Sequence, residues 1–162
     1  MLKHNPSLYF QSIRTNPQRC ANAVPLSQLS ADLAANTVPD FAWIGPNLCH
    51  STHGCPLEEA DRWLASVVSS ILASPAWKDG GVLIITWDEG NTDAGCCAIA
   101  EGGRIPLVVV SSRGPFNYRS STPYSHYSLL RSLEDNWGLR HLGHAADAGT
   151  RAMDDLLPPP GR

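Results

Sequence analysis

Residues 82–90 read VLIITWDEG and join an apolar run directly to two adjacent carboxylates. Such an unbroken run of β-favouring residues is typical of a strand buried on both faces inside a parallel sheet. In open α/β sheets, ligands bind beyond the carboxyl ends of the strands. Asp88 and Glu89 therefore follow the predicted strand where such a fold usually binds its ligand, and Gly90 allows a sharp turn beside them. The other interpretation is a strand that ends in a solvated acidic turn.

The composition predicts a single folded domain over residues 1–162. Hydrophobic residues make up 43% of the chain and charged residues 17%, so the chain can bury a core. The formal net charge of -3 contains no basic excess, which argues against nucleic acid as a partner. The apolar runs are too short for a transmembrane segment. The first residues lack the apolar stretch of a signal peptide, and the localisation stays open.

The pattern of segments predicts an α/β fold with a mainly parallel sheet flanked by helices. Apolar periodicity and turn residues predict helices over 25–35, 57–73 and 125–138 and strands over 41–44, 82–86 and 105–111. In the last helix, Tyr127, Leu129, Leu130, Leu133 and Trp137 form the expected apolar side. The tail from residue 142 onward is small and polar, and we expect it on the surface.

Residues 47–56, NLCHSTHGCP, place two cysteines and two histidines directly after the predicted strand 41–44. A zinc site would need four well-spaced ligands, and a second Cys/His pair is missing nearby. A disulfide between Cys49 and Cys55 would close a small loop. An imidazole at the ligand-binding edge of the sheet could also act as a general acid. We favour the disulfide loop, with His53 presented by it.

Other reactive side chains have more ordinary interpretations. His4 has no partner nearby in sequence, and a surface or capping role is the common one for such a residue. His126 lies in the first turn of the helix over 125–138, where packing or capping is also the more common role. Cys96 and Cys97 are adjacent in a glycine-rich loop, and adjacent cysteines rarely pair. We therefore expect different partners for them, or free thiols.

Several motifs, spread in order along nearly the whole chain, resemble the phosphoesterase family of bacterial phospholipases C and related acid phosphatases, within the alkaline phosphatase superfamily. They are KHNP at 3–6 with YF at 9–10, PNLC at 46–49 followed by His53, WKDGG at 77–81, TWDEG at 86–90, GGRIP at 102–106, SHYSLL at 125–130 and EDNWGL at 134–139.

The resemblance implies a metal-dependent phosphoester hydrolase acting on a phosphate ester. It implies that Asp88 and Glu89 bind the catalytic divalent metal ion, and hard carboxylate oxygens suit an ion that polarises a phosphoryl oxygen. His53 resembles the histidine that protonates the departing alkoxide, and His4 resembles one that lies against the phosphate. The family also implies a secreted or periplasmic location.

The resemblance covers only the C-terminal half of the family's domain, so it implies an incomplete alkaline-phosphatase-like fold. The family's Asn-containing motif, which supplies further metal ligands, and its Ser or Thr nucleophile are not found in this sequence. Two carboxylates alone make a poor metal site, and the covalent step requires a nucleophile. The chain is then part of an enzyme that works with a missing N-terminal half. The alternative is a stand-alone, non-catalytic α/β domain with a structural or binding role.

Overall fold

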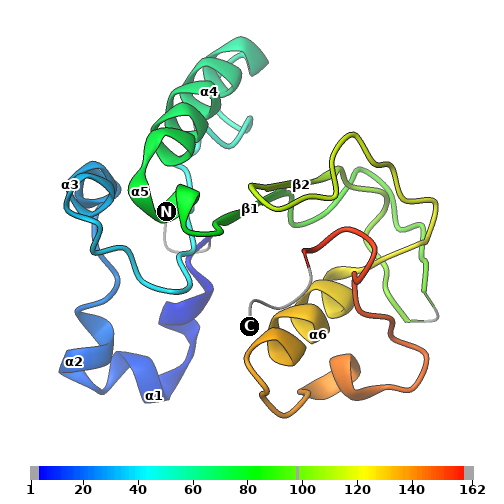
Figure 1. Ribbon diagram of the computed structural model, residues 1–162. Coiled ribbons are helices and arrows are strands. Elements are labelled where there is room, and N and C mark those ends of the chain that lie inside the picture. Colours follow the sequence, from blue (N-terminus) through cyan, green and yellow to red (C-terminus); the bar gives the residue numbers. More distant parts are fainter. Residues whose placement is uncertain (1–3, 98, 159–162) are drawn as a thin grey trace. The chain divides into compact units, whose positions relative to one another are not determined.

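The computed structural model describes residues 4–97 and 99–158 and divides the chain into two compact units, Met1–Asp79 and Gly80–Arg162 (Figure 1). In the described ranges, no helix has both the length and the apolar character needed to cross a membrane. The single-domain organisation over 1–162 stays a prediction.

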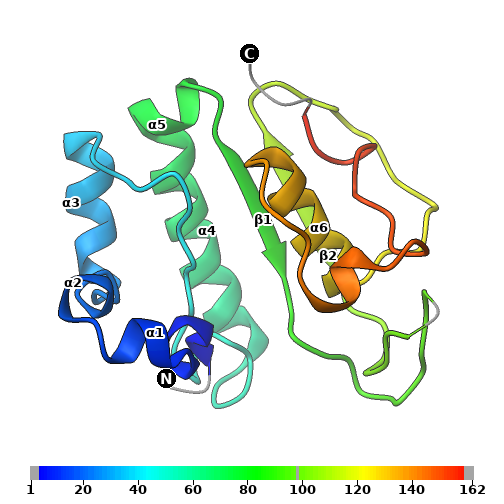
Figure 2. The same ribbon diagram turned by 90° about the horizontal axis from the view of Figure 1, so that it is seen from below.

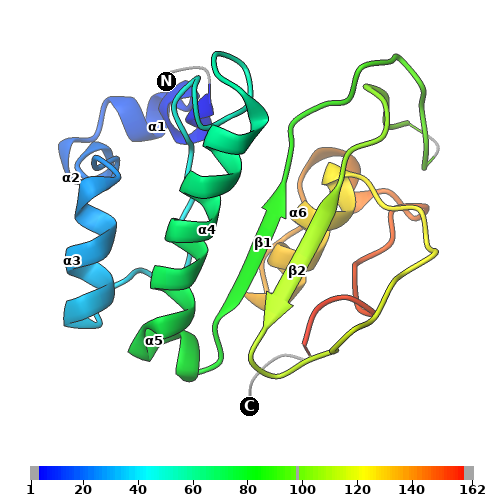
Figure 3. The same cartoon turned by 90° about the horizontal axis from the view of Figure 1, so that it is seen from above.

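The first unit is helical. Its elements are η2 (Pro6–Tyr9), α1 (Gln11–Arg14), α2 (Pro17–Cys20), α3 (Ser27–Ala35), α4 (Leu57–Ala73) and α5 (Pro75–Lys78). The two longer helices confirm the predictions for 25–35 and 57–73, and they lie side by side (Figures 2 and 3). Leu33 of α3 and Ala60 of α4 are buried. Asn36 ends α3 in the left-handed conformation, with φ of 55°, which asparagine tolerates better than most residues.

The predicted strand over 41–44 is wrong, because these residues have no regular secondary structure. Phe41 and Trp43 are exposed, and the Trp43 Nε1–H donates a hydrogen bond to the backbone oxygen of His4 over 3.1 Å. A strand needs a neighbour for its backbone groups. The described part of the first unit contains no other strand, so no strand pairing forms at this segment.

The second unit contains a two-stranded sheet. Strand β1 (Val82–Thr86) confirms the first predicted strand, and β2 (Leu107–Ser111) confirms most of the second. The strands are antiparallel, with Val82 opposite Ser111 and Thr86 opposite Leu107, so the prediction of a mainly parallel sheet is wrong for the described residues. A parallel pair requires a long crossover, usually a helix. The described part of the connection between β1 and β2 contains no helix, so the chain reverses direction and β2 runs antiparallel to β1.

Apolar side chains occupy both faces of this sheet. Cross-strand partners share a face, so Leu83 pairs with Val110 on one face and Ile84 with Val109 on the other. Expected burial on both faces is not observed: most strand residues are half-buried, and Val108 is 49% exposed. The residues are thus suited to a sheet covered on both sides, although the described chain covers it incompletely.

Helix α6 (His126–Asn136) lies along one face of the sheet (Figures 2 and 3). Its start is a capping box in which the Ser125 and Ser128 side chains each bind the other residue's backbone. The expected apolar side is only partly covered: Tyr127, Leu129 and Leu133 are half-buried, whereas Leu130 and Trp137 are exposed. The fully buried residues of α6 are polar, namely Ser128, Ser132 and Glu134, which the sequence did not indicate.

The C-terminal tail explains the burial of this polar side. Its described residues are mainly exposed or half-buried, as expected of a surface segment, but Met153 is 2% exposed and Ala145, in η3 (Gly143–Ala146), is fully buried. Its backbone binds the polar side of α6: the Met153 N–H donates to Ser132 Oγ over 2.7 Å. The Leu142 N–H donates to Glu134 Oε1 over 3.1 Å. Small polar residues permit this close approach, which periodicity alone does not reveal.

Asp155 fastens the tail to the loop before α6. Its carboxylate accepts hydrogen bonds from Tyr124 (2.5 Å), Ser120 (2.7 Å) and Tyr118 (3.1 Å). Partial burial favours the neutral acid, but these three donors outweigh it and hold the pKa of Asp155 below its ordinary value. Burial, followed by the hydrogen bond to Asp155, raises the pKa of Tyr124 to about 12.

The disulfides confirm one expectation and correct another. Cys49 is bonded to Cys55, as predicted, and Cys20 is a free thiol. Cys96 and Cys97 are bonded to each other, so the expectation of separate partners or free thiols is wrong. Cys97 has a left-handed backbone, with φ of 56°, in a reversal where Cys96 bridges to Ala100. This turn brings the two adjacent side chains together.

Candidate active site

The two carboxylates predicted as metal ligands lie directly beyond the C-terminal end of β1. Asp88 and Glu89 are both exposed, and Asp88 Oδ1 accepts a hydrogen bond from the Glu89 N–H over 3.2 Å. The Gly90 N–H donates to the Gly102 oxygen over 2.7 Å. A Cβ at Gly90 would lie 2.8 Å from the backbone oxygen of Arg104, so only glycine fits here. The loop 90–104 therefore folds back beside the carboxylates.

His126 joins this site, although the sequence favoured a packing or capping role for it. Its Nε2 lies 2.8 Å from the backbone oxygen of Asp88. A carbonyl oxygen only accepts, so Nε2 carries the proton in this contact. The capping box at Ser125 fixes the start of α6 and thus the position of the ring. This hydrogen bond thereby joins the start of α6 to Asp88, just after the end of β1.

The chemistry of these donors fits a divalent cation only in part. Carboxylate oxygens are the preferred ligands of hard cations such as Mg²⁺ and Ca²⁺, which take six or more oxygen ligands. In the described ranges, no third His, Cys, Asp or Glu completes a close group with Asp88 and Glu89. The pair could therefore supply part of a metal site, and further oxygen ligands would have to come from substrate, water or additional protein.

The two predicted catalytic histidines lie together in the first unit. The ring centroids of His4 and His53 are 5.9 Å apart, with an angle of 27° between the planes. His53 is exposed at the tip of the Cys49–Cys55 loop, where the N–H groups of His53 and Gly54 both donate to the Leu48 oxygen. Because the carboxylates belong to the other unit, the expectation that His53 shares a cleft with them stays a prediction.

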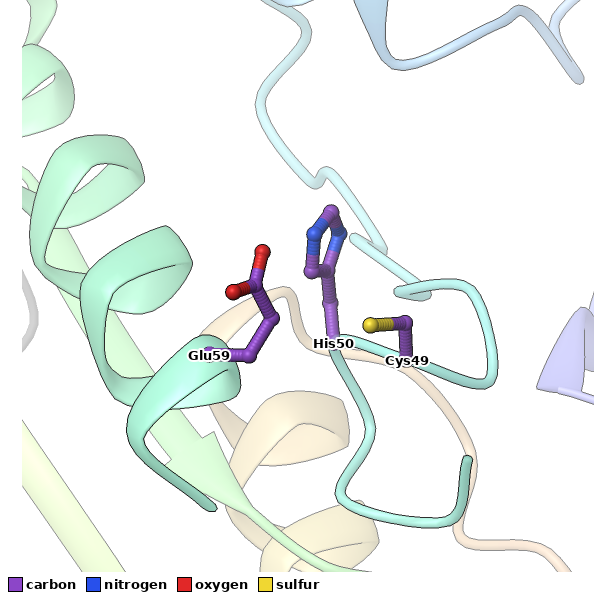
Figure 4. Close-up of side chains that lie close together, drawn as sticks. All are labelled: Cys49, His50 and Glu59. Carbon is purple, nitrogen blue, oxygen red and sulfur yellow. The ribbon is translucent and has the colours of Figure 1, made fainter. Parts of the chain in front are cut away.

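A second cluster of possible metal ligands lies at the base of the same loop. Ligand atoms of Cys49, His50 and Glu59 all lie within 4.8 Å of one another, and Figure 4 shows the three side chains converging. Glu59 comes from the first turns of α4. The sequence offered the cysteine and histidine but gave no sign of the glutamate, because only the packing of α4 brings it to the loop.

Comparison with known sequences assigns the class of protein. Residues 3–140 match the sequence profile of the Phosphoesterase family. The chain therefore belongs to the phosphoesterase family, which confirms the resemblance drawn from its motifs. No solved structure matches the chain significantly.

Several curated relatives carry phosphatase or phospholipase names. A probable acid phosphatase of Kluyveromyces lactis is 30% identical over 150 residues, covering 90% of this chain and 34% of the relative. A phosphatidylinositol-3-phosphatase of Mycobacterium tuberculosis is 28% identical over 147 residues, covering 90% and 44%. A hemolytic phospholipase C of Pseudomonas aeruginosa is 24% identical over 170 residues, covering 83% and 23%. The chain spans about a third of the length of the acid phosphatases that it matches, as its 34% share of the first shows.

Proposed function

We propose that this chain is the metal-binding part of a metal-dependent phosphoester hydrolase, of the acid phosphatase or phospholipase C type, that works together with further protein. The observation that carries the proposal is the pair Asp88 and Glu89 at the open end of β1 in a chain of the phosphoesterase family. In this proposal the pair binds the ion, which would polarise a phosphoryl oxygen of the substrate.

The requirement for further protein rests on the length of the relatives. The acid phosphatase relatives are about three times longer, since the chain covers 34% of one and 33% of another. In this proposal, an additional segment supplies the nucleophile and the remaining metal ligands.

The histidines have separate roles in the proposal. His53 is the acid that donates a proton to the departing alkoxide oxygen, and its exposed position at the loop tip leaves it accessible to a substrate. His4, stacked on His53, lies against the phosphate. Both assignments follow the family's motifs and are tested by substitution.

The first experiment compares the isolated 162-residue chain with the same chain preceded by whatever sequence the genome encodes in frame upstream. Hydrolysis of p-nitrophenyl phosphate and bis(p-nitrophenyl) phosphate is measured with Mg²⁺, Mn²⁺, Ca²⁺ or Zn²⁺ and after chelation. We expect no turnover above background for the isolated chain and metal-dependent turnover for the extended one. An upstream sequence without a Ser or Thr nucleophile would favour the non-catalytic alternative.

Substitutions then assign the carboxylates. Asp88→Asn and Glu89→Gln should each reduce kcat/KM of the active form at least about 100-fold, because a catalytic metal contributes several kcal/mol to transition-state stabilisation. Asp93→Asn is the matched control, since Asp93 is an exposed carboxylate in the same loop. Turnover by the isolated chain that disappears in Asp88→Asn would instead show that the nucleophile lies within these 162 residues.

The leaving group tests His53. If His53 protonates the alkoxide, His53→Ala should slow the hydrolysis of alkyl phosphates about 100-fold or more and spare p-nitrophenyl phosphate, whose leaving group needs little protonation. His4→Ala should affect both substrates alike through binding. Equal losses on both substrates in His53→Ala would contradict the role of general acid.

A further inference from the structure

We infer that the Cys49–Cys55 loop and α4 form a zinc site that is assembled when the disulfide is reduced. Its ligands are the thiolates of Cys49 and Cys55, one ring nitrogen of His50 and one carboxylate oxygen of Glu59. The site is separate from Asp88 and Glu89 and does not depend on the proposed hydrolase activity.

The geometry of the side chains suits zinc. Ligand atoms of Cys49, His50 and Glu59 lie within 4.8 Å of one another, and Cys55 Sγ is held beside this group by its bond to Cys49 Sγ. Zinc binds sulfur at about 2.3 Å and nitrogen at about 2.0–2.1 Å, so tetrahedral ligands are about 3.3–3.8 Å apart. A contraction of about 1 Å would therefore bring these three ligands to zinc-binding distances, and the Cys55 thiolate released by reduction would be the fourth ligand. Two thiolates, an imidazole and a carboxylate are all established zinc ligands.

The positions of these ligands do not rest on the disulfide alone. The backbone of the loop is closed by the hydrogen bonds of His53 N–H (3.1 Å) and Gly54 N–H (2.8 Å) to the Leu48 oxygen. The His50 N–H also donates to Asn47 Oδ1 over 2.9 Å. The His50 ring stacks on Trp63 of α4, with centroids 5.0 Å apart and planes 9° apart. These contacts hold the loop against α4 after reduction.

The oxidised structure explains why the group is not a zinc site as it stands. A disulfide sulfur is not a thiolate, which is the form that binds zinc. Only His50 and Glu59 then remain as ligands. Glu59 is also paired with Arg62, with 2.6 Å between Oε2 and Nη2. This pair is largely exposed, and such surface pairs contribute little, so a zinc ion can replace the arginine.

The reaction is balanced with a phosphine as reductant. The phosphine takes the oxygen of one water molecule and becomes a phosphine oxide, while the disulfide receives two electrons and two protons and becomes two thiols. Zinc then displaces the two thiol protons, so binding should weaken as the pH falls. A cellular dithiol could serve in the same way, becoming a disulfide itself.

The test is a Co²⁺ titration of the full 162-residue chain before and after phosphine treatment, followed by competition with Zn²⁺. We expect the reduced chain to give the intense visible bands of tetrahedral Co²⁺ and a thiolate charge-transfer band, both lost when Zn²⁺ is added. The oxidised chain should give neither. Equal binding by both forms, or no binding by the reduced form, would overturn the inference.

Variants identify the ligands in the reduced chain. Cys55→Ser, His50→Ala and Glu59→Gln should each weaken zinc binding at least about 100-fold, because even partners outside the ligand shell are worth about 10–100-fold. His53→Ala, in the same loop, Cys20→Ser, and the double variant Cys96→Ser with Cys97→Ser should bind zinc normally. Binding that survives His50→Ala and Glu59→Gln, or that disappears in the other cysteine variants, would place the metal elsewhere and overturn the inference. Circular dichroism of each variant checks its fold.

Discussion

At the scale of single residues, the region after β1 depends on backbone contacts as much as on its carboxylates. Gly90 allows the loop to return because a side chain there would collide with Arg104. His126 binds the carbonyl oxygen of Asp88, so this contact does not occupy the carboxylate oxygens of Asp88. His126, which is not one of the two proposed ligands, therefore fixes the backbone of Asp88.

Replacing His126 tests this positioning role. In His126→Ala, the Asp88 carbonyl loses its partner, and we expect Mn²⁺ affinity to fall about 10–100-fold, as for other partners behind a metal ligand. His126→Gln, which keeps an N–H donor, should recover part of the loss. His141→Ala is the control, because His141 pairs with Asp135 at the other end of α6. Electron paramagnetic resonance of free Mn²⁺ measures the affinity. Unchanged affinity in a folded His126→Ala would contradict the role.

Tyr124 predicts an alkaline transition. Its pKa is raised to about 12, so the folded chain keeps the phenol proton longer than the unfolded chain, whose tyrosine pKa is about 10. The contribution of this group to stability is complete below pH about 10 and is lost as the pH rises toward about 12. Ultraviolet titration should show a phenolate phase near 12 that Tyr124→Phe removes and Tyr9→Phe retains. A titration curve that Tyr124→Phe leaves unchanged would contradict this.

Asp155 acts at the opposite end of the pH scale. Because its pKa is lowered in the folded chain, its contribution to stability is present above the ordinary carboxyl pKa and is lost as the pH falls through the lower, folded value. Asp155→Asn should therefore lower the free energy of unfolding near neutral pH. It should also make the free energy of unfolding depend less on pH in the acid range. Urea midpoints measured from pH 7 to 3 check the result, with Asp93→Asn as the control. Urea midpoints that fall equally with pH in wild type and Asp155→Asn would contradict this expectation.

At the scale of elements, α6 is held in place by contacts at its start and along its serine side. The capping box places its first turn beside β1, and the tail covers its serine side. On its apolar side, Leu130 and Trp137 are exposed, whereas Tyr127, Leu129 and Leu133 are half-buried. An apolar side that is only partly covered in the described chain is consistent with the further protein proposed above.

The capping box gives a prediction at this scale. Ser125→Ala removes a side-chain oxygen that accepts from the backbone of Ser128, and we expect a loss of about 1 kcal/mol in the free energy of unfolding. Ser121→Ala, an exposed serine in the preceding loop, should change it by less than about 0.5 kcal/mol. Urea unfolding followed by circular dichroism measures both. A Ser125→Ala variant as stable as Ser121→Ala would show that the cap contributes nothing measurable.

At the scale of the whole molecule, the sheet is the least complete feature. Only β1 and β2 pair in the described residues, so each strand has an unpaired edge, and such edges invite pairing with other chains. Apolar residues on both faces add to this tendency. The isolated chain should therefore self-associate unless further protein covers the sheet.

Light scattering of the isolated chain tests this expectation. We expect self-association, reduced by Val108→Lys, since Val108 is 49% exposed on β2. Val24→Lys is the matched control, because Val24 is also exposed but lies outside the sheet, and it should change nothing. A monomeric wild-type chain with a sharp cooperative unfolding transition would show that it is self-sufficient and would favour the non-catalytic alternative.

The sequence alone determined those elements that depend on residues close together in the chain. The run 82–86, the helix over 57–73 and the Cys49–Cys55 loop formed as predicted, because β-branched runs, helical periodicity and short-range cysteine spacing act within a few residues. The motifs spread along the chain, among them the one around Asp88 and Glu89, also indicated the family, and the profile match over 3–140 confirms it.

Only the tertiary structure decided which distant residues meet. It paired β1 with β2 in antiparallel register, buried the serine side of α6 under Met153, and brought His126 to Asp88 and Glu59 to His50. None of these contacts has a signature in spacing or composition. Each depends on the path of a connecting loop, and many paths satisfy the same local preferences until the packed chain selects one.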